Sequence, residues 1–251
     1  MRGLLLLRPL PIAQVAANSG DGAAFLGTPD PKEVYRAGAA GWIQVNIDLG
    51  AVSTFDTIFV GHTNAVADAA WRIERTSSIG GGDPVTVMGE RAFPISGSGS
   101  QRPHGLFTAD EAITTRFLRL NIRQTLGFAP FEAGTLLVGT RIEQPYEYKS
   151  GRRLIDLSER VEMTGGGFGF GRGAVKASFR FTLADIDDAK LRTLWRLIRE
   201  QGNQHPVLLV EGGDGAIEHD QLHYCVFGPF EAYERDNPDD TRWSLQVTDW
   251  T

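Results

Sequence analysis

The sequence predicts a mainly β protein with two parts. The N-terminal part is expected to be a β-sandwich or jelly roll, and the C-terminal part an α+β domain in which one helix flanks a β-sandwich. Several short segments alternate apolar and polar residues, which is the pattern of strands with one buried face. The 251 residues include 30 glycines, as turn-rich β proteins require. Only residues 183–201 show the clear periodicity of an amphipathic helix.

The first 140 residues carry the strand pattern most clearly at Ile43–Leu49. There Ile43, Val45, Ile47 and Leu49 alternate with polar residues. Further strands are expected at Thr57–Gly61, Ala70–Thr76, Thr115–Ile122 and Ala133–Val138. Segments rich in glycine, proline and serine separate them, and this arrangement is typical of a sandwich or jelly roll.

The helix expected at about residues 183–201 has recognisable start and stop signals. Thr182 and Asp185 have the spacing of a capping box. Gly202 is expected to cap the C-terminus. The apolar stripe that should pack on a sheet consists of Leu191, Leu194, Trp195 and Ile198.

Strands are expected on both sides of this helix. Ala174–Thr182 alternates and precedes it. The strands expected after it are Val207–Glu211, Leu222–Phe227, Phe230–Arg235 and Trp243–Trp250. A polar segment with one proline, at 140–152, separates the two parts of the chain. We therefore predict one domain at 1–145 and a second at 146–251.

The composition argues against several classes of partner. The formal net charge is −6 and no cluster of Lys and Arg is present, which disfavours sequence-specific nucleic-acid binding. No stretch approaches the ~18 apolar residues of a membrane helix, so we expect no membrane insertion. The apolar run Leu4–Leu7 is shorter than the about 7–15 residues of a signal peptide, and we expect an ordered strand there instead.

The side chains most often used in metal and thiol chemistry do not form a convincing site. His219 and His223 have the spacing of two metal ligands on a helix, but the surrounding residues favour a turn and a strand. Four residues of a strand span about 13 Å, too far for one ion. Cys225 is the only cysteine, which excludes an intrachain disulfide and fits a reducing compartment. It lies in an apolar strand and is expected to be a core residue.

The glycine-rich stretch GGGFGFGRG, residues 165–173, invites a phosphate-binding interpretation. It lacks the Lys and Ser or Thr of a nucleotide-binding loop, and a strand rather than a helix follows it. We interpret it as a mobile loop that carries aromatic residues. The acidic cluster Asp236, Asp239 and Asp240 is explained by a turn. We therefore predict no catalytic residues, no cofactor and no metal, and expect the protein not to be an enzyme.

Four segments in order resemble the discoidin-like domains, the coagulation-factor type C group. They are GWIQVNIDLG, TFDTIFVGHTNA, AWRIERTSS and RFLRLNI, and the resemblance covers about residues 12–139. It implies a jelly roll that binds glycans or other surfaces through loops at one end. The paired cysteines that often link the two ends of these domains are absent. We expect Trp42 to belong to the core and consider Trp71 as a possible ligand-facing aromatic residue.

Residues 150–251 resemble distal-tail and tail-tip (minor tail) proteins of long-tailed bacteriophages. The order SERVEMTGGGFGFGRGAVKASFRFTL, helix, GNQHPVLLV and WSLQV carries this resemblance. It implies a tail-tube-like fold whose subunits join their sheets edge to edge around a channel. A hexameric ring is expected from the resemblance, with the tail tube and tip or hub proteins as further partners.

The resulting hypothesis is a structural virion protein of a phage or prophage tail, made in the bacterial cytoplasm without a signal peptide. The C-terminal domain would form the ring, and the jelly roll would dock tip proteins or contact cell-surface glycan. Phe168, Phe170 and Arg172 are the candidates for an assembly loop. The alternative is a soluble, oligomeric, lectin-like protein. A carbohydrate-active enzyme is the third and least favoured possibility.

Overall fold

The computed structural model describes residues 3–95, 102–147, 150–212, 217–237 and 240–250. The chain forms two compact units. One, which we call the sandwich unit, comprises Leu7–Arg141 and Ala216–Gln221. The other, which we call the helix unit, comprises Met1–Leu6, Ile142–Gly215 and Leu222–Thr251. Both are built mainly from antiparallel strands, and the predicted mainly β fold class is confirmed.

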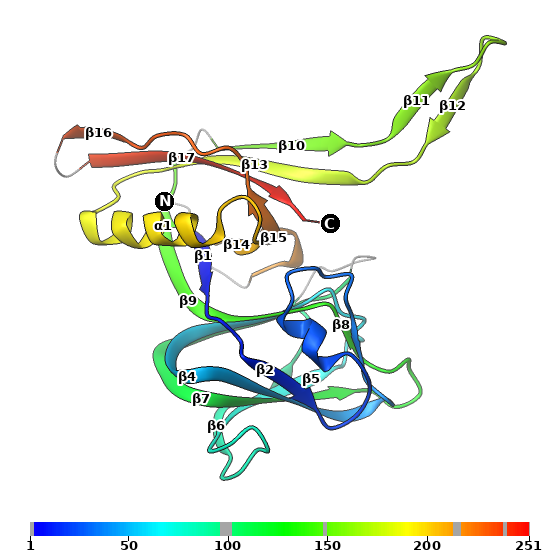
Figure 1. Cartoon of the computed structure of the whole chain (residues 1–251), viewed down its shortest axis with the longest axis vertical. Coiled ribbons are helices and arrows are strands. Elements are labelled where there is room, and N and C mark those ends of the chain that lie inside the picture. Colours follow the sequence, from blue (N-terminus) through cyan, green and yellow to red (C-terminus); the bar gives the residue numbers. More distant parts are fainter. Residues whose placement is uncertain (1–2, 96–101, 148–149, 213–216, 238–239, 251) are drawn as a thin grey trace. The chain divides into compact units, whose positions relative to one another are not determined.

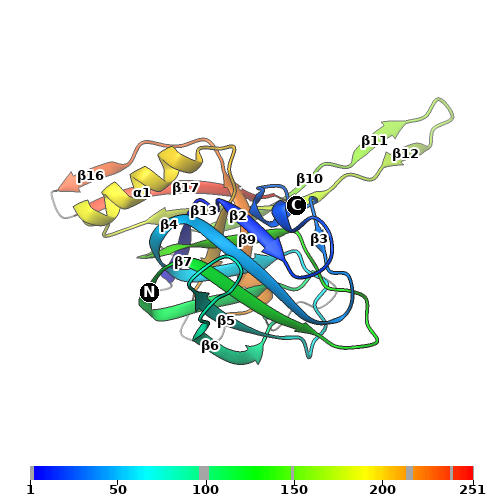
Figure 2. The same cartoon turned by 60° about the horizontal axis from the view of Figure 1, so that its bottom comes forward.

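The sandwich unit is organised around two long strands, β4 (Gly41–Gly61) and β7 (Gly105–Gln124), which run side by side (Figures 1 and 2). In the order of pairing, β4 lies between β9 (Thr135–Pro145) and β7, and β5 (Ala70–Thr76) and β6 (Val85–Ala92) follow β7. The smaller elements are β2 (Gln14–Ala17), a 3-10 helix at Ala23–Gly27, β3 (Tyr35–Arg36), β8 (Glu132–Ala133) and a 3-10 helix at His219–Gln221.

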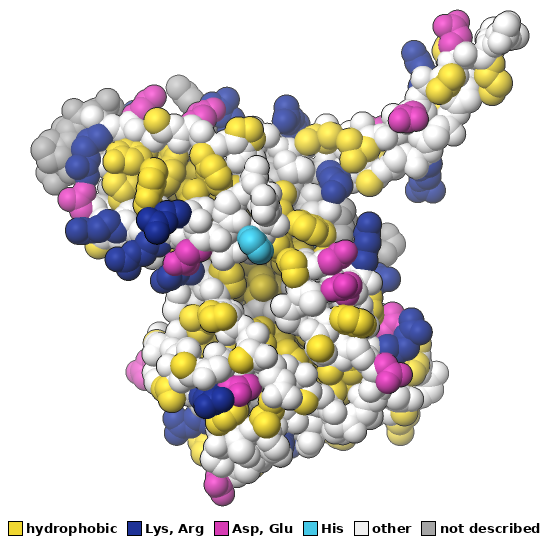
Figure 3. Space-filling model, viewed as in Figure 1, with side chains coloured by type: hydrophobic (Ala, Val, Ile, Leu, Met, Phe, Trp, Pro, Cys, Tyr) yellow, Lys and Arg dark blue, Asp and Glu magenta, His cyan; other side chains and the backbone are white. Residues whose placement is uncertain are grey.

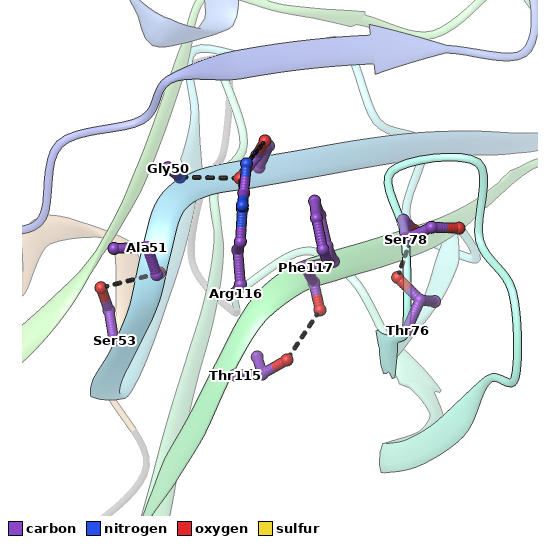
Figure 4. A network of polar contacts seen from close by, with 9 residues as sticks. Gly50, Ala51, Ser53, Thr76, Ser78, Thr115, Arg116 and Phe117 are labelled. Carbon is purple, nitrogen blue, oxygen red and sulfur yellow. Dashed lines mark hydrogen bonds and ion pairs between the residues drawn. The ribbon is translucent and has the colours of Figure 1, made fainter.

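Two strands that the sequence predicts separately, Ile43–Leu49 and Thr57–Gly61, are the two halves of β4. The strand bends after Asp48, where its pairing register with β7 shifts, and Gly50 adopts a φ of 78°. The Asp48 carboxylate accepts the Gly50 N–H at 2.7 Å and two hydrogen bonds from Arg116 at 2.8 and 2.9 Å. Figure 4 shows Arg116 reaching from β7 toward β4 beside Gly50. The Arg116 guanidinium holds the pKa of Asp48 below its ordinary value, so this ionic contact stabilises the bend.

The helix unit contains one curved sheet and one helix. Its strands pair in the order β10 (Gly151–Asp156), β13 (Val175–Leu183), β17 (Asp240–Asp249), β15 (Leu222–Phe227), β14 (Val207–Glu211) and β1 (Gly3–Pro9). The short strand β16 (Glu234–Asn237) pairs with β17. A separate two-stranded hairpin consists of β11 (Glu159–Glu162) and β12 (Phe168–Gly171).

The two units are not separated by one boundary near residue 145, because each is built from more than one segment of the chain. Leu4, Leu5 and Leu6 of β1 pair with β14, so the start of the chain belongs to the helix unit. The chain then enters the sandwich unit within β1 and leaves it within β9. The ordered strand expected at Leu4–Leu7 is therefore β1, and its residues Leu4, Leu5 and Leu6 extend the sheet of the helix unit.

The helix α1 (Asp188–Gln201) begins later than the sequence predicts. Its N-cap is Asp187, whose carboxylate accepts the Lys190 N–H at 2.8 Å. The expected capping box at Thr182 and Asp185 is wrong, because β13 continues through Leu183 and the Thr182 hydroxyl lies 2.9 Å from that of Ser244. The predicted C-cap at Gly202 is confirmed by its N–H, which donates to the Ile198 carbonyl at 2.7 Å.

The helix packs its apolar stripe into the core, with one exception. Leu191, Leu194 and Ile198 are buried, as predicted. Trp195 is 51% exposed and does not join them. The strand expected at Phe230–Arg235 is also wrong in most of its length, since only β16 forms there and Phe230 lies outside it. Residues 230–233 instead run as irregular chain beside α1.

Candidate binding surfaces

The glycine-rich stretch forms the hairpin β11–β12, which extends beyond β10 and β13 in Figures 1 and 2. The expectation of a loop is correct only for its tip. There the Met163 N–H donates to the Gly167 carbonyl at 2.7 Å, and Gly166 adopts a φ of 82°. The remaining residues form strands, because Arg160 pairs with Phe170 and Glu162 with Phe168.

The hairpin exposes large apolar side chains along its length. Phe170 is 76% exposed and Phe168 46%. Val161 and Met163 are exposed as well, and Figure 3 shows apolar side chains on this projection. The Arg160 guanidinium lies 4.5 Å from the centre of the Phe168 ring. Phe168 and Phe170 thus lie together on the hairpin, and the exposed Arg172 follows directly after β12.

The base of the hairpin is held by polar contacts that favour one geometry. The Gly173 N–H donates to the Ser158 hydroxyl at 3.1 Å, and the Ser158 N–H donates to the Asp156 carboxylate at 2.9 Å. A Cβ atom at Gly173 would lie 2.1 Å from the Leu157 carbonyl oxygen, so only glycine fits there. The hairpin is therefore attached to β10 and β13 by a defined junction.

The two candidate tryptophans of the sandwich unit have exchanged roles relative to the prediction. Trp71 is 1% exposed and packs edge-on against Phe93 at 5.2 Å between ring centres, so its assignment as a ligand-facing residue is wrong. Trp42 is 48% exposed, so its assignment to the core is also wrong. A signal for this was present in β4: Trp42 has the same parity as Gln44, whereas Ile43 and Val45 face the core.

Trp42 lies among arginines and further exposed apolar residues. The guanidinium groups of Arg72 and Arg123 lie 5.5 and 5.9 Å from the centre of its ring. Each arginine is also paired with a carboxylate, Arg72 with Glu74 at 3.3 Å and Arg123 with Glu90 at 3.0 Å. Leu126 and Phe128, in the loop after β7, are exposed too. Trp42 is therefore an aromatic surface of the sandwich unit that a ligand can reach.

The two histidines singled out by their spacing do not act together. His219 is buried in the sandwich unit, where its ring stacks on His104 at 4.5 Å and its Nε2 lies 2.8 Å from the Arg102 carbonyl. His223 lies in β15 of the helix unit. No group of His, Cys, Asp and Glu suited to a metal ion occurs among the described residues.

The remaining side chains that the sequence suggested for chemistry are the thiol of Cys225 and the acidic cluster near residue 238. Cys225 is completely buried, as expected, and burial raises the pKa of its thiol. The side chains of Asp236, Asp239 and Asp240 lie outside the described part of the structure. No helix in the described ranges has the length and apolar character needed to cross a membrane.

A partly buried ionic cluster in the helix unit was not anticipated from the sequence. His223 lies 3.5 Å from Glu211 and 3.5 Å from Asp249, and Arg152 of β10 pairs with Glu211 of β14 at 2.7 Å. Burial alone would lower the pKa of His223, but the two carboxylates outweigh it and hold this pKa above its ordinary value. Burial would likewise raise the pKa of Glu211, but His223 and Arg152 hold it below its ordinary value.

The Arg152–Glu211 pair joins strands that are not neighbours in the sheet. Between β10 and β14 lie β13, β17 and β15, so the sheet must curve to bring the two side chains together. Beside this pair is a cavity of about 240 Å³. Its lining includes Leu4, Tyr146, Phe179 and Phe181. Because Arg152 and Arg180 are each paired with a glutamate, the described residues of this lining offer no uncompensated cation to a ligand.

Neither a protein-family model nor a curated protein sequence matches the chain. Several solved structures are similar in backbone. The family 32 carbohydrate-binding module of Clostridium perfringens NanJ, solved in complex with galactose, is 14% identical, with a TM-score of 0.42 over 55% of this chain and 99% of that one. Module CBM32-3 from a Clostridium perfringens family 31 glycoside hydrolase is 13% identical, with a TM-score of 0.43 over 53% and 94%.

A chain from the structure of reduced XRCC1 bound to the DNA polymerase β catalytic domain is similar to the same degree. It is 17% identical, with a TM-score of 0.41, covering 54% of this chain and 98% of its own length. These similarities concern the backbone of about half of the chain. They do not support a ligand or an activity for it.

Proposed function

We propose that this chain is a structural protein of a bacteriophage tail. In this proposal the helix unit joins copies of itself into a ring at the distal end of the tail tube. The sandwich unit docks tip proteins or contacts cell-surface glycan. The assignment to a tail comes from the sequence pattern of residues 150–251, and the observation that supports self-assembly is the apolar hairpin β11–β12.

The hairpin is poorly suited to remain in solvent alone. A two-stranded hairpin without a covered face is marginally stable in water. In the described part of the chain, β11 and β12 pair only with each other, which leaves both outer edges open to another strand. Contact of a neighbouring copy with the face that carries Phe168 and Phe170 would bury both rings, and each buried apolar Å² contributes about 25 cal/mol.

Such a contact is heterologous, because the hairpin of one copy meets a different surface of the next. Heterologous contacts close into rings when the rotation between copies allows it. The strand β10 ends the pairing order of the sheet in the helix unit and offers a second edge for such a contact. Six copies, and the tail tube and hub proteins as partners, remain predictions from the family resemblance.

The test compares two double variants, each of which replaces two exposed apolar side chains. Phe168→Ser with Phe170→Ser removes the aromatic residues of the hairpin, and Leu126→Ser with Phe128→Ser removes apolar residues of the sandwich unit. Electron microscopy of tails assembled with each variant should show loss of rings and tails for the first and normal assembly for the second. Normal rings with the hairpin variant, or with residues 165–171 deleted, would show that the hairpin is not an assembly element.

A lectin-like function is the second candidate, and one observation favours it. Trp42 presents an exposed aromatic face with two arginines over it, a surface that a sugar ring could stack on. A glycan array probed with the full chain and with Trp42→Ala tests this function, with Phe25→Ala, another exposed aromatic residue of the same unit, as control. Strong binding that only Trp42→Ala abolishes, in a protein that forms no ring, would favour the lectin. The absence of enzymatic activity stays a prediction.

A further inference from the structure

An aromatic cluster that we call the tryptophan platform lies where α1 meets β17 and the chain before β16. It consists of Trp195, Tyr233 and Trp243. The Trp195 and Trp243 rings stack with their centres 5.7 Å apart and their planes 28° apart. Tyr233 meets both rings edge-on, at 6.2 and 5.8 Å between centres. Figure 3 shows apolar side chains gathered over α1 with basic side chains beside them.

The tryptophan platform has one buried member, Trp243, and two solvent-exposed members, Trp195 and Tyr233. Trp243 is buried, and its indole N–H donates to the Glu231 carbonyl at 2.9 Å. Trp195 rests on it and is half exposed, and Tyr233 is exposed as well. The contact between α1 and the sheet is made by Leu191, Leu194 and Ile198, so the exposed part of Trp195 is not required to fill the core.

Arginines flank the platform on the helix surface. Residues three and four positions apart are neighbours on a helix, which places Arg192 and Arg199 on either side of Trp195. Over its whole length α1 carries four basic and two acidic side chains: Lys190, Arg192, Arg196 and Arg199 against Asp188 and Glu200. This balance is the reverse of that of the chain, whose formal net charge is −6.

The carboxylates nearest the platform already have basic partners. Asp188 pairs with Arg235, and Glu231 pairs with Arg180 at 3.2 Å. Within the described ranges, neither Arg196 nor Arg199 forms an ion pair. The platform therefore combines an accessible tryptophan, a tyrosine and arginine charges that are not compensated by the described part of the molecule.

We propose that the tryptophan platform docks an acidic segment of another protein, one that carries an apolar or aromatic anchor residue. Trp, Tyr and Arg are the residues most enriched among those that dominate binding energy at protein interfaces. The arginines favour a negatively charged partner and would speed its encounter with the platform. This proposal uses a surface separate from β11–β12 and does not depend on the ring.

The probe for the test is a fluorescent peptide of alternating glutamate and serine with one central phenylalanine. A matched peptide has lysine in place of every glutamate, and an oligothymidine of equal charge controls for charge alone. Fluorescence anisotropy with the full chain should show binding of the acidic peptide only. Trp195→Ala and the double variant Arg196→Ala with Arg199→Ala should each weaken it by about tenfold or more. Phe25→Ala, which removes an exposed aromatic residue from the other unit, should leave the affinity unchanged.

The arginine variant keeps the aromatic stack intact, so its result stands even if Trp195→Ala disturbs folding. Raising the salt concentration should weaken binding to the original protein and have less effect on the arginine variant. The proposal is overturned if neither peptide binds, if the lysine peptide or the oligothymidine binds equally well, or if both platform variants keep full affinity. Self-association of the chain that depends on Trp195 would instead make the occupant a second copy and would also overturn it.

Discussion

The two units expose apolar side chains in different ways. In the sandwich unit the exposed large apolar residues are spread over separate turns and strand ends, and they are Phe25, Trp42, Val52, Val85, Leu126 and Phe128. In the helix unit seven of them follow one another along the hairpin and its base, and they are Leu154, Leu157, Val161, Met163, Phe168, Phe170 and Val175. Single exposed apolar residues are normal on a protein surface, whereas a concentration of them on one projecting segment indicates a contact surface.

The charges around the two exposed tryptophans differ as well. Beside Trp42, Arg72 and Arg123 each have a glutamate partner, so the surface is close to neutral. Beside Trp195 the nearby carboxylates are bound to arginines from outside the helix, and the described residues leave Arg196 and Arg199 uncompensated. The difference indicates that an uncharged ligand suits the first surface better and an acidic partner the second.

The largest expected effect is the difference in stability between variants of a buried and of an exposed tryptophan in the sandwich unit. Trp71→Ala should lower the free energy of unfolding by about 3–5 kcal/mol, because it leaves a cavity against Phe93. Trp42→Ala should change it by less than about 1 kcal/mol, since the ring is half exposed. Denaturant unfolding of both variants measures this. Equal losses would show that Trp42 is structural and would remove it as a candidate binding residue.

The next prediction concerns the rigidity of the hairpin at its base, which substitutions of two glycines test. Gly173→Ala places a methyl group against the Leu157 carbonyl. The substitution should lower the free energy of unfolding by about 1–3 kcal/mol, or separate the base of the hairpin from β10 and β13. Gly165→Ala, at the tip, meets no atom within 4 Å and should have little effect. Limited proteolysis of the hairpin and thermal unfolding report the difference. If both variants behave like the original protein, the hairpin is a loosely attached arm.

A smaller effect concerns the pH dependence of the helix unit. His223 has a raised pKa, so its contribution to stability is complete below its ordinary value of 6.5 and is lost as the pH rises through the folded-state value. Glu211 has a lowered pKa, so its contribution is present above 4.5 and is lost as the pH falls. The cluster therefore stabilises the unit most between about pH 4.5 and 6.5.

His223→Gln isolates the histidine part of this dependence. The loss of stability caused by the substitution should be greater at pH 5.5 than at pH 8.5, and the variant should lack the decline that begins above about pH 6.5. Thermal unfolding across this range measures both. A difference between the proteins that stays constant with pH would mean that the two carboxylates do not raise the pKa of His223.

The smallest effect on folding is expected at the hairpin itself. Phe170→Ser removes a side chain that is 76% exposed, so the free energy of unfolding should change by no more than about 0.5 kcal/mol. Denaturant unfolding of the unassembled protein provides the value. A large loss would show that Phe170 packs within its own chain, and the contrast between the two units would then disappear.

The sequence was sufficient for elements whose pattern is local. The strands Ala70–Thr76, Val207–Glu211 and Leu222–Phe227 match β5, β14 and β15, because turn residues mark both of their ends. The start of α1 was misplaced because Thr182 and Asp185 match a capping motif while β13 continues past them. A local motif cannot reveal that a neighbouring strand competes for the same residues.

The candidate sites depended more on tertiary contacts and were predicted less well. Phe168 and Phe170 were found because glycine and aromatic residues concentrate in one stretch. Trp42 was misjudged although the parity of its strand would have placed it outside. The pairing of Arg152 with Glu211 arises from the curvature of the whole sheet, which no short segment encodes. Trp195 fitted the helix stripe, and only the structure shows that it rests on Trp243.

Cryo-electron microscopy of assembled tail particles that contain this chain tests the proposed ring most directly. We expect a closed ring of helix units at the distal end of the tube, with Phe168 and Phe170 of each copy buried against the next copy. A tail in which this chain forms no ring, or a ring in which the hairpin β11–β12 remains in solvent in every copy, would contradict it.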